Sequence, residues 1–289
     1  MAQSQLSSIV PKPDHVPDAL VYDFDIHGDP ELLVNPHGRL LDMARNAPPV
    51  FWTPRNGGGW VILSHAANYA ASRDTEAFSS EFVPKAQMDA MLASLPPGAP
   101  HIPLPVPITL DPPEHTKYRQ PLQKVFSPKT INSLRTSIKD LAAELIDAVK
   151  ADGACEFMSA IAEPLPVQVF LKMLGLPLER QEEYRAIVKE HMAAIDTDRA
   201  GSMRRLQRIA AAMRDTVLDR KDNPRDDILS MLWQIEIDGK PTTLADMENY
   251  GVLLFIAGLD TVMNGMGLAM RGLALDPALQ NQLRAEPKL

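Results

Sequence analysis

Cysteine is almost absent from the sequence, which has one, Cys155, among 289 residues. A single thiol cannot form an intrachain disulfide, a CxxC redox pair or a zinc site of several cysteines, which favours a reducing compartment. We expect Cys155, in DGACEFMS, to be a structural thiol in a strand. The seven histidines do not cluster at the spacing of metal ligands, so no catalytic zinc site is predicted.

A basic block, a leader and a long apolar run are also missing. The 29 basic and 37 acidic residues give a net charge of −8, which argues against a nucleic-acid partner because phosphate binding needs clustered Lys and Arg. The N-terminus has no basic region followed by an apolar run, so it is not a secretory signal. The longest strongly apolar stretch, 250–257, is far short of the ~20 residues that span a membrane. We therefore expect a cytoplasmic protein without membrane contact.

Several familiar catalytic motifs are absent as well. The sequence has no GxGxxG after a strand, no GxxxxGK(S/T), no GxSxG and no HExxH. Its composition, 45% hydrophobic and 23% charged, is typical of soluble globular proteins. The length allows one large domain or two small ones, and we expect a single domain over 1–289.

Proline, in contrast, is abundant: the chain has 26, where the usual content of about 5% would give about 14. The first cluster, in 1–30, predicts an arm that docks on the rest or is loosely attached. The second runs from Leu95 to Pro113 as LPPGAPHIPLPVPITLDPP, whose eight prolines cannot support a helix, and it ends the predicted substrate loop 82–113. A long irregular loop of this kind is usually functional. Its regularly spaced apolar residues favour a loop that packs against another part of the molecule.

The remaining patterns predict a fold that is mainly α with a small β-sheet part. The segment 50–63 alternates and pivots on three glycines, which predicts a β-hairpin. From residue 114 onward, apolar residues recur at helical spacing over most of the chain. The last long helix, 244–275, is almost wholly apolar, so we expect it to run through a core.

Two polar side chains in that apolar helix, Asp260 and Thr261, are candidates for function. A buried carboxylate without a partner loses several kcal/mol of solvation, so such residues usually have a role. The Thr261 hydroxyl can bond back to the carbonyl of Ala257, and Gly258 loosens the helix, which predicts a kink or bulge with a groove for a small ligand or water. The alternative is a paired core acid beside an inert threonine.

A second candidate pair follows the proline-rich loop, in DPPEHTKYR. The segment 111–114 has an acid and prolines typical of a helix start. His115 and Arg119 then lie four residues apart on one helical face, where two donors suit a carboxylate or a phosphate. The alternative is an ordinary pair on a helix surface.

Taken together, these segments resemble the cytochrome P-450 haem-thiolate monooxygenases, specifically the bacterial camphor-hydroxylase class. The resemblance rests on the order of the hairpin, LDPPEHTKYR, EPLPVQVFLKMLGLP, DDILSML and FIAGLDTVMN, and it covers nearly all of the chain. AGLDT resembles the family's oxygen-activation motif A/G-G-x-D/E-T, and HTKYR resembles the H-x-x-x-R motif that holds a haem propionate. The resemblance implies a cytochrome P-450 fold.

The family's ExxR helix and the cysteine loop that ligates the iron are expected downstream of Leu289. The sequence therefore looks like the N-terminal two-thirds of such an enzyme, truncated before both elements. Cys155 cannot stand in for the axial ligand, so we expect no thiolate-ligated haem, and no activity, from these 289 residues alone.

The resemblance also implies roles for individual residues around haem b. Thr261 would hydrogen-bond the dioxygen or its attendant water, and Asp260 would feed protons toward it. Ala257 and Gly258 would leave space for oxygen, while His115 and Arg119 would bind a propionate. The substrate wall would come from Phe82, His101, Ile108, Met192, Leu253, Ile256 and Val262.

This wall implies a compact hydrophobic substrate such as a terpenoid or norisoprenoid. Camphor hydroxylases anchor their ketone through a tyrosine in this loop, and 82–110 has none; its polar candidate is His101, so we expect a larger apolar substrate than camphor to bind better. Electrons would come from NADH through a reductase and a [2Fe-2S] ferredoxin to a monomeric enzyme. The basic patch for that partner is thin, with Lys117, Arg119 and Lys124.

Two readings from other classes stay open. One is a non-catalytic helical protein that binds haem or a small ligand. The other is a structural or regulatory all-α module without a cofactor.

Overall fold

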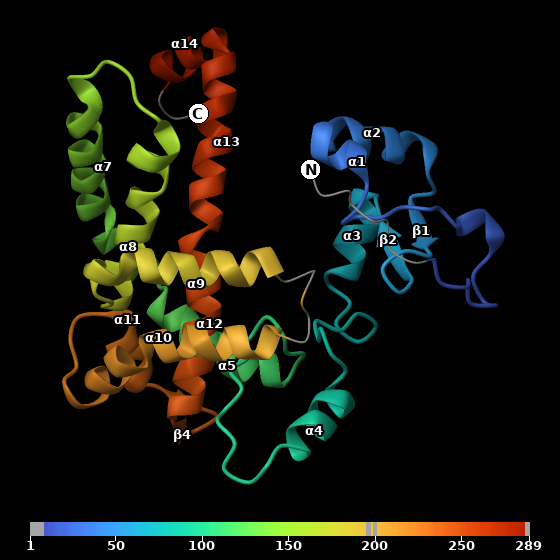
Figure 1. The fold of residues 1–289 in the computed structure, drawn as a ribbon, viewed down its shortest axis with the longest axis horizontal. Coiled ribbons are helices and arrows are strands. Elements are labelled where there is room, and N and C mark those ends of the chain that lie inside the picture. The colour runs from blue at the N-terminus through green and yellow to red at the C-terminus, as the bar shows by residue number, and fades with distance from the viewer. Residues whose placement is uncertain (1–8, 195–197, 199–200, 287–289) are drawn as a thin grey trace. The chain divides into compact units, whose positions relative to one another are not determined.

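The computed structural model describes residues 9–194, 198 and 201–286. Its internal contacts divide the chain into two compact units, Met1–Ser79 and Ser80–Leu289 (Figure 1). The single domain expected from the sequence stays a prediction. Each unit is described by itself below.

Unit 1 is built on the hairpin of β1 (Val50–Thr53) and β2 (Gly59–Ile62), which pair antiparallel over the predicted segment. The described part of the N-terminal arm docks on this hairpin: Val10 N–H donates to the Pro54 carbonyl and Tyr22 N–H to that of Trp52, both at 3.0 Å. The side chains of Phe24, Met43 and Phe51 form the small buried core of this unit.

The helices of unit 1 are η1 (Asp18–Leu20), α1 (Pro30–Val34), α2 (Pro36–Asn46) and α3 (His65–Ala71). Helices α1 and α2 begin in the same way. The side chains of Asp29 and Asn35 accept from the backbone N–H of Glu31 and Gly38 at 2.9 and 3.0 Å, and a proline follows each cap. Such a proline fixes φ where the backbone N–H has no helical partner anyway.

Unit 2 is mainly helical, which confirms the predicted fold class. Its helices are α4 (Lys85–Ala93), α5 (Glu114–Val125), α6 (Pro128–Ser133), α7 (Arg135–Lys150), η2 (Met158–Ala162), α8 (Pro164–Leu174), η3 (Leu178–Arg180), α9 (Gln181–Ala194), α10 (Ser202–Asp222), α11 (Ile228–Trp233), α12 (Leu244–Leu259), α13 (Thr261–Leu275) and α14 (Pro277–Ala285). A short hairpin, β3 (Glu236–Ile237) with β4 (Lys240–Pro241), precedes α12.

The core of unit 2 lies where α8, α9, α10 and α12 meet, and Figure 1 shows α9 and α10 running side by side, transverse to α12. Tyr184 and Phe255 are fully buried there, with ring centroids 5.2 Å apart in an edge-to-face arrangement. Phe170 packs against the same Phe255 ring from α8, at 6.5 Å. Aromatic pairs of this geometry add to the hydrophobic stabilisation of a core.

Unit 2 confirms one expectation from the sequence and corrects two. Residues 95–113 have no helix, as their prolines predict, and α4, which begins after Pro84, lies in the first part of the predicted substrate loop 82–113. Cys155 is exposed and lies outside any strand, between α7 and η2. The apolar helix 244–275 is not continuous, because Asp260 leaves the helical conformation with φ −125° and ψ −35°.

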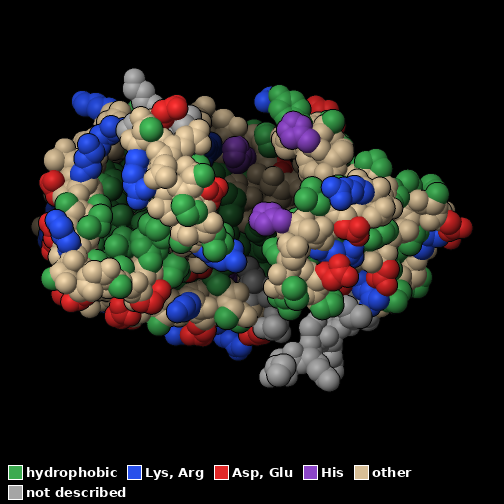
Figure 2. All heavy atoms as spheres, turned by 90° about the horizontal axis from the view of Figure 1, so that it is seen from above, with side chains coloured by type: hydrophobic (Ala, Val, Ile, Leu, Met, Phe, Trp, Pro, Cys, Tyr) green, Lys and Arg blue, Asp and Glu red, His purple; other side chains and the backbone are tan. Residues whose placement is uncertain are grey.

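Only the first half of that apolar stretch is buried as expected. Helix α12 has eight buried residues, whereas α13 has one, Met263. Leu268 and Leu275 are 71% and 70% exposed, and Figure 2, which looks onto the end of unit 2 where α13 and α14 lie, shows hydrophobic side chains between charged ones. By length and composition alone, Leu244–Leu275 could cross a membrane, a test that core helices of soluble proteins also pass.

A buried ion pair joins the ends of three helices. Arg220 and Asp227 side chains are 6% and 4% exposed, and Arg220 Nε donates to Asp227 Oδ2 at 2.6 Å. Arg220 Nη2 also donates to the carbonyl of Gly175, which ends α8 with a φ of +79°. Asp227 caps α11 by accepting from Ser230 N–H at 2.8 Å. The pair therefore fixes the ends of α8, α10 and α11 relative to one another.

Replacing Arg220 by alanine (Arg220→Ala) is expected to lower the free energy of unfolding by about 3–5 kcal/mol, because Asp227 is left buried without its cation. The matched control is Arg208→Ala on the same helix. The Arg208 side chain is 56% exposed and pairs with an exposed Glu190, so its loss should cost less than about 1 kcal/mol. Chemical denaturation compares the two, and equal small losses would contradict the assignment.

Candidate functional site

Helix α12 is fixed at its start by a capping box and by α5. Thr243 Oγ1 accepts from Asp246 N–H at 3.2 Å, and Asp246 Oδ2 accepts from Thr243 N–H at 2.9 Å. Asp246 also accepts from Tyr118 OH at 3.1 Å, while Tyr250 OH donates to the Tyr118 carbonyl at 2.9 Å. Burial, and then the Asp246 carboxylate, raises the pKa of Tyr118 to about 12. Helix α5 is therefore held against the first turns of α12.

On α5, the predicted donor pair has no competing partner. His115 is half-buried and Arg119 is exposed, and neither side chain makes a hydrogen bond or an ion pair within the described ranges. Lys117, between them, differs. Its ammonium lies 2.9 Å from Glu114 and 3.2 Å from Asp238, and these bonds raise its pKa. The pair can therefore bind an added anion, whereas the charge of Lys117 is already balanced.

The interruption between α12 and α13 has the hydrogen bond that the sequence predicts. Thr261 Oγ1 donates to the carbonyl of Ala257 at 2.6 Å. Asp260 is half-buried, and its Oδ2 accepts from Asn264 Nδ2 at 3.3 Å. Thr261 is exposed, and so is Ala257. Because the hydroxyl hydrogen goes to Ala257, the lone pairs of Oγ1 remain open to a donor from outside.

The glycine in this segment faces the core. A Cβ on Gly258 would lie 2.3 Å from the ring of Phe170, so the packing of α12 on α8 requires glycine here without any ligand. Ala257 is exposed, whereas Gly258 packs against Phe170, and the expected role of both residues beside oxygen stays a prediction.

The predicted substrate residues fall into two groups. Leu253 and Ile256 are half-buried on one face of α12, in line with Asn249 and Asp260 at a spacing of four, three and four residues. We call these four residues the α12 stripe. The other apolar candidates are exposed, at 77% for Phe82, 52% for Ile108, 41% for Met192 and 52% for Val262. The structure thus brings two of the six together, and the role of all six stays a prediction.

His101 is exposed but has partners. Its Nε2 lies 3.0 Å from Asn249 Oδ1, and its carbonyl accepts from Gln207 Nε2 at 3.2 Å. The ring is therefore bonded to α12, and it remains a candidate polar group of the loop.

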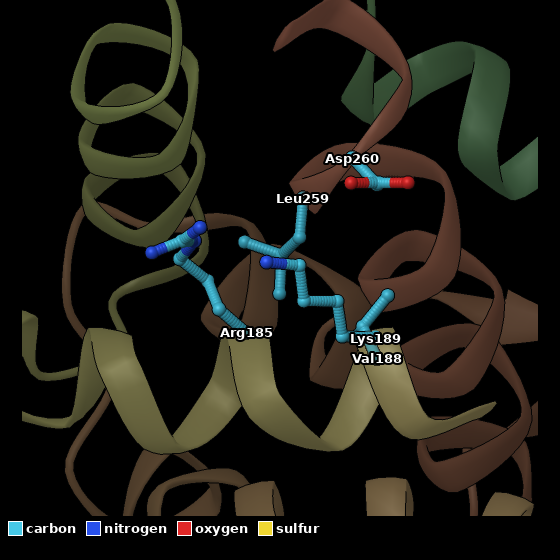
Figure 3. A pocket seen from close by; sticks show the side chains of 5 residues that line it. All are labelled: Arg185, Val188, Lys189, Leu259 and Asp260. Carbon is cyan, nitrogen blue, oxygen red and sulfur yellow. The ribbon is translucent and has the colours of Figure 1, made fainter. Parts of the chain in front are cut away.

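A shallow cleft that is open to solvent adjoins the interruption (Figure 3). Arg185, Val188 and Lys189 line it from α9, and Leu259 and Asp260 from the end of α12. In Figure 3 the Arg185 guanidinium lies on one side of Leu259 and the Asp260 carboxylate on the other, and the Lys189 side chain overlaps Leu259 in this view. Arg185 pairs with Glu163. Arg185 and Lys189 were not predicted as site residues, because their spacing of four residues was the only signal in the sequence.

Comparisons with known proteins bear on this arrangement. The chain is 32% identical over 286 residues to the probable cytochrome P450 127A1 of Sinorhizobium fredii, covering 96% of this chain and 66% of that protein. It is 25% identical to linalool 8-monooxygenase of Pseudomonas putida, covering 88% and 64%. The crystal structure of CYP101J2 superposes with a TM-score of 0.78 at 30% identity, covering 96% and 67%. No protein-family model matches the chain.

The fold and the order of its elements define a mainly helical protein of the type seen in these relatives. The chain belongs to the cytochrome P450 family, which confirms the resemblance found in the sequence. It spans 66% and 64% of the two curated relatives named above.

The Tyr118 contact predicts a dependence of stability on pH. Its pKa is about 12 in the folded chain and about 10 in an unfolded one, so this contribution to stability is complete below pH 10 and is lost as the pH rises toward 12. Unfolding free energies measured from pH 9 to 11.5 should fall more steeply for the wild type than for Tyr118→Phe. Parallel slopes would show that Tyr118 titrates normally.

Proposed function

We propose that this chain is part of a haem-dependent monooxygenase that hydroxylates a compact hydrophobic substrate of the terpenoid or norisoprenoid class. The observation that carries the proposal is the interruption after α12, where the Thr261 hydroxyl bonds to Ala257 beside the Asp260 carboxylate. It lies at the end of a stripe that presents Leu253 and Ile256. Membership of the cytochrome P450 family supports it, and one relative is named linalool 8-monooxygenase.

The residues present fit haem b. His115 and Arg119 offer donors without a partner in the described chain, four residues apart, which suits the carboxylate of a propionate. When bound, haem supplies the dioxygen chemistry, with a cysteine thiolate expected from downstream of Leu289.

Thr261 and Asp260 would handle water and protons. Thr261 gives its own hydrogen to the Ala257 carbonyl, so it can accept from a water and hold that water at Oγ1. Asp260, next in the chain and partly accessible, would carry protons to the same water from the cleft that Lys189 lines. The small exposed side chain of Ala257 would keep the space beside them open.

The substrate and the electron donor would approach different surfaces. Leu253 and Ile256 would form an apolar wall, together with the other candidates of the substrate loop. Electrons would come from NADH through a reductase and a [2Fe-2S] ferredoxin. Of the thin basic patch, Lys124 would be free to meet it, because Lys117 is balanced by Glu114 and Asp238 and Arg119 would hold the propionate. The enzyme would be a cytoplasmic monomer.

Carbon monoxide binding to the reduced, haem-loaded protein tests the proposal. The complete enzyme, with the cysteine loop expected downstream of Leu289, should give a thiolate-type carbonyl spectrum, whereas these 289 residues alone should not. An ionone-type ketone should produce a larger spin-state shift than camphor, because 82–110 has no tyrosine to anchor the camphor ketone. Haem binding without that spectrum and without turnover would instead indicate the non-catalytic haem-binding protein.

The proposed propionate contact predicts a change in haem retention. Arg119→Leu removes a charge-assisted hydrogen bond worth roughly 1.5–3 kcal/mol, so haem should dissociate about 10- to 100-fold faster. Transfer of haem to excess apomyoglobin measures the rate. Gln123→Ala, at an exposed amide on the same helix, is the control and should leave the rate unchanged. Equal rates in both variants would remove Arg119 from the haem site.

The hydroxyl of Thr261 predicts a change in coupling. Thr261→Ala should keep substrate binding but divert electrons to peroxide, because no oxygen atom holds the water, whereas Thr261→Ser should keep most of the coupling. Asp260→Asn should slow turnover instead, because the amide carries no proton. Comparing NADH consumed with product and peroxide formed decides this. Unchanged coupling in the alanine variant would exclude Thr261 from the reaction.

A further inference from the structure

The proline-rich loop is fastened to two helices through His101 and Leu104. Asn249 Oδ1, on α12, accepts from Leu104 N–H at 2.9 Å and lies 3.0 Å from His101 Nε2. From α10, Gln207 Nε2 donates to the His101 carbonyl at 3.2 Å. With His101 Nε2 as donor, Asn249 uses both acceptor positions of its side-chain carbonyl on the loop.

The loop has few other ways to bond to a helix. Prolines occupy positions 100, 103, 105 and 107, and none of them has an N–H to donate. Ile102 and Val106 are only 8% and 4% exposed, so this segment is packed down and an unpaired Leu104 N–H there would be costly. A side-chain acceptor on α12 satisfies that N–H, and it fixes the height of the loop above the helix.

Asn249 is also the first residue of the α12 stripe. Leu253 and Ile256 follow it after four and three residues and lie on the same helical face. The anchored segment 101–104 is therefore tied to the N-terminal end of the face that carries the candidate apolar wall.

We propose that Asn249 is a positioning residue for substrate: by holding the 101–104 segment through its Oδ1, it sets one wall of the substrate site and limits the size of substrate that fits. This inference rests on the proposed function. Asn249 acts through the loop and does not touch the reacting atoms.

Hydrogen exchange of the loop gives a direct test in the haem-loaded protein. Since prolines carry no amide hydrogen, exchange over 102–107 reports on Ile102, Leu104 and Val106. Asn249→Ala should accelerate exchange at Leu104 roughly 3- to 10-fold, the effect of one lost hydrogen bond. Asn249→Asp keeps two acceptors and should restore protection. Asn132→Ala, at an exposed amide on α6, should change nothing.

Turnover by the same variants of the complete enzyme separates positioning from a merely structural role. Asn249→Ala should raise KM for the preferred substrate about 3- to 10-fold, change kcat less than twofold, and favour bulkier substrates; Asn249→Asp should restore the KM. If Asn249→Ala does not fold, His101→Ala, which removes one of the two bonds at an exposed residue, should give about a 2- to 3-fold change in the same direction.

Unchanged exchange at Leu104 would overturn the inference, and so would faster exchange with an unchanged KM. Failure of the proposed function has a different signature: the complete enzyme with Asn249 unchanged would lack the thiolate-type spectrum, whatever the exchange at Leu104 shows.

Discussion

The close approach of α12 to α8 and α10 is the constraint on which unit 2 depends. A Cβ on Gly258 would lie 2.3 Å from the Phe170 ring, and one on Gly251 would lie 2.8 Å from the Met213 methyl. These glycines are seven residues apart, so they share one face of the helix, and at 100° per residue the α12 stripe falls on the opposite face. The glycine face of α12 packs closely on α8 and α10, and the opposite face stays available to the loop and to a ligand.

Much of this fold follows from local patterns in the sequence, and the exceptions have physical causes. The hairpin and the helices after residue 114 obey their periodicities. The exposure of α13 does not follow, because hydropathy measures the tendency to be buried and not the presence of a neighbour. The β3–β4 hairpin was missed although its turn is Asp238-Gly239, both at positive φ, a dipeptide that favours such turns. The caps Asp29-Pro30 and Asn35-Pro36 likewise indicated α1 and α2.

The candidate site was predictable where its chemistry is local. The bond from Thr261 to Ala257 and the shared face of His115 and Arg119 need only helical spacing. Contacts between distant segments were not predictable: Asn249 meets His101 across 148 residues, and nothing in α12 alone distinguishes it from a surface amide. Gly258 shows that a local motif can also mislead. A glycine in AGLDT suggests room for a ligand, but the structure requires glycine at this position because the Phe170 ring packs against it.

The exposed Cys155 gives the chain one natural attachment point for a thiol-reactive probe. It lies three residues before Met158, whose sulfur would be 2.4 Å from a Cβ on Gly267 of α13. A spin label or fluorophore on this thiol would therefore sit beside the contact between η2 and α13 without any engineered cysteine. The spectrum of such a label would report whether α13, the helix after Asp260, stays packed on η2. The same labelled protein could be used to measure activity.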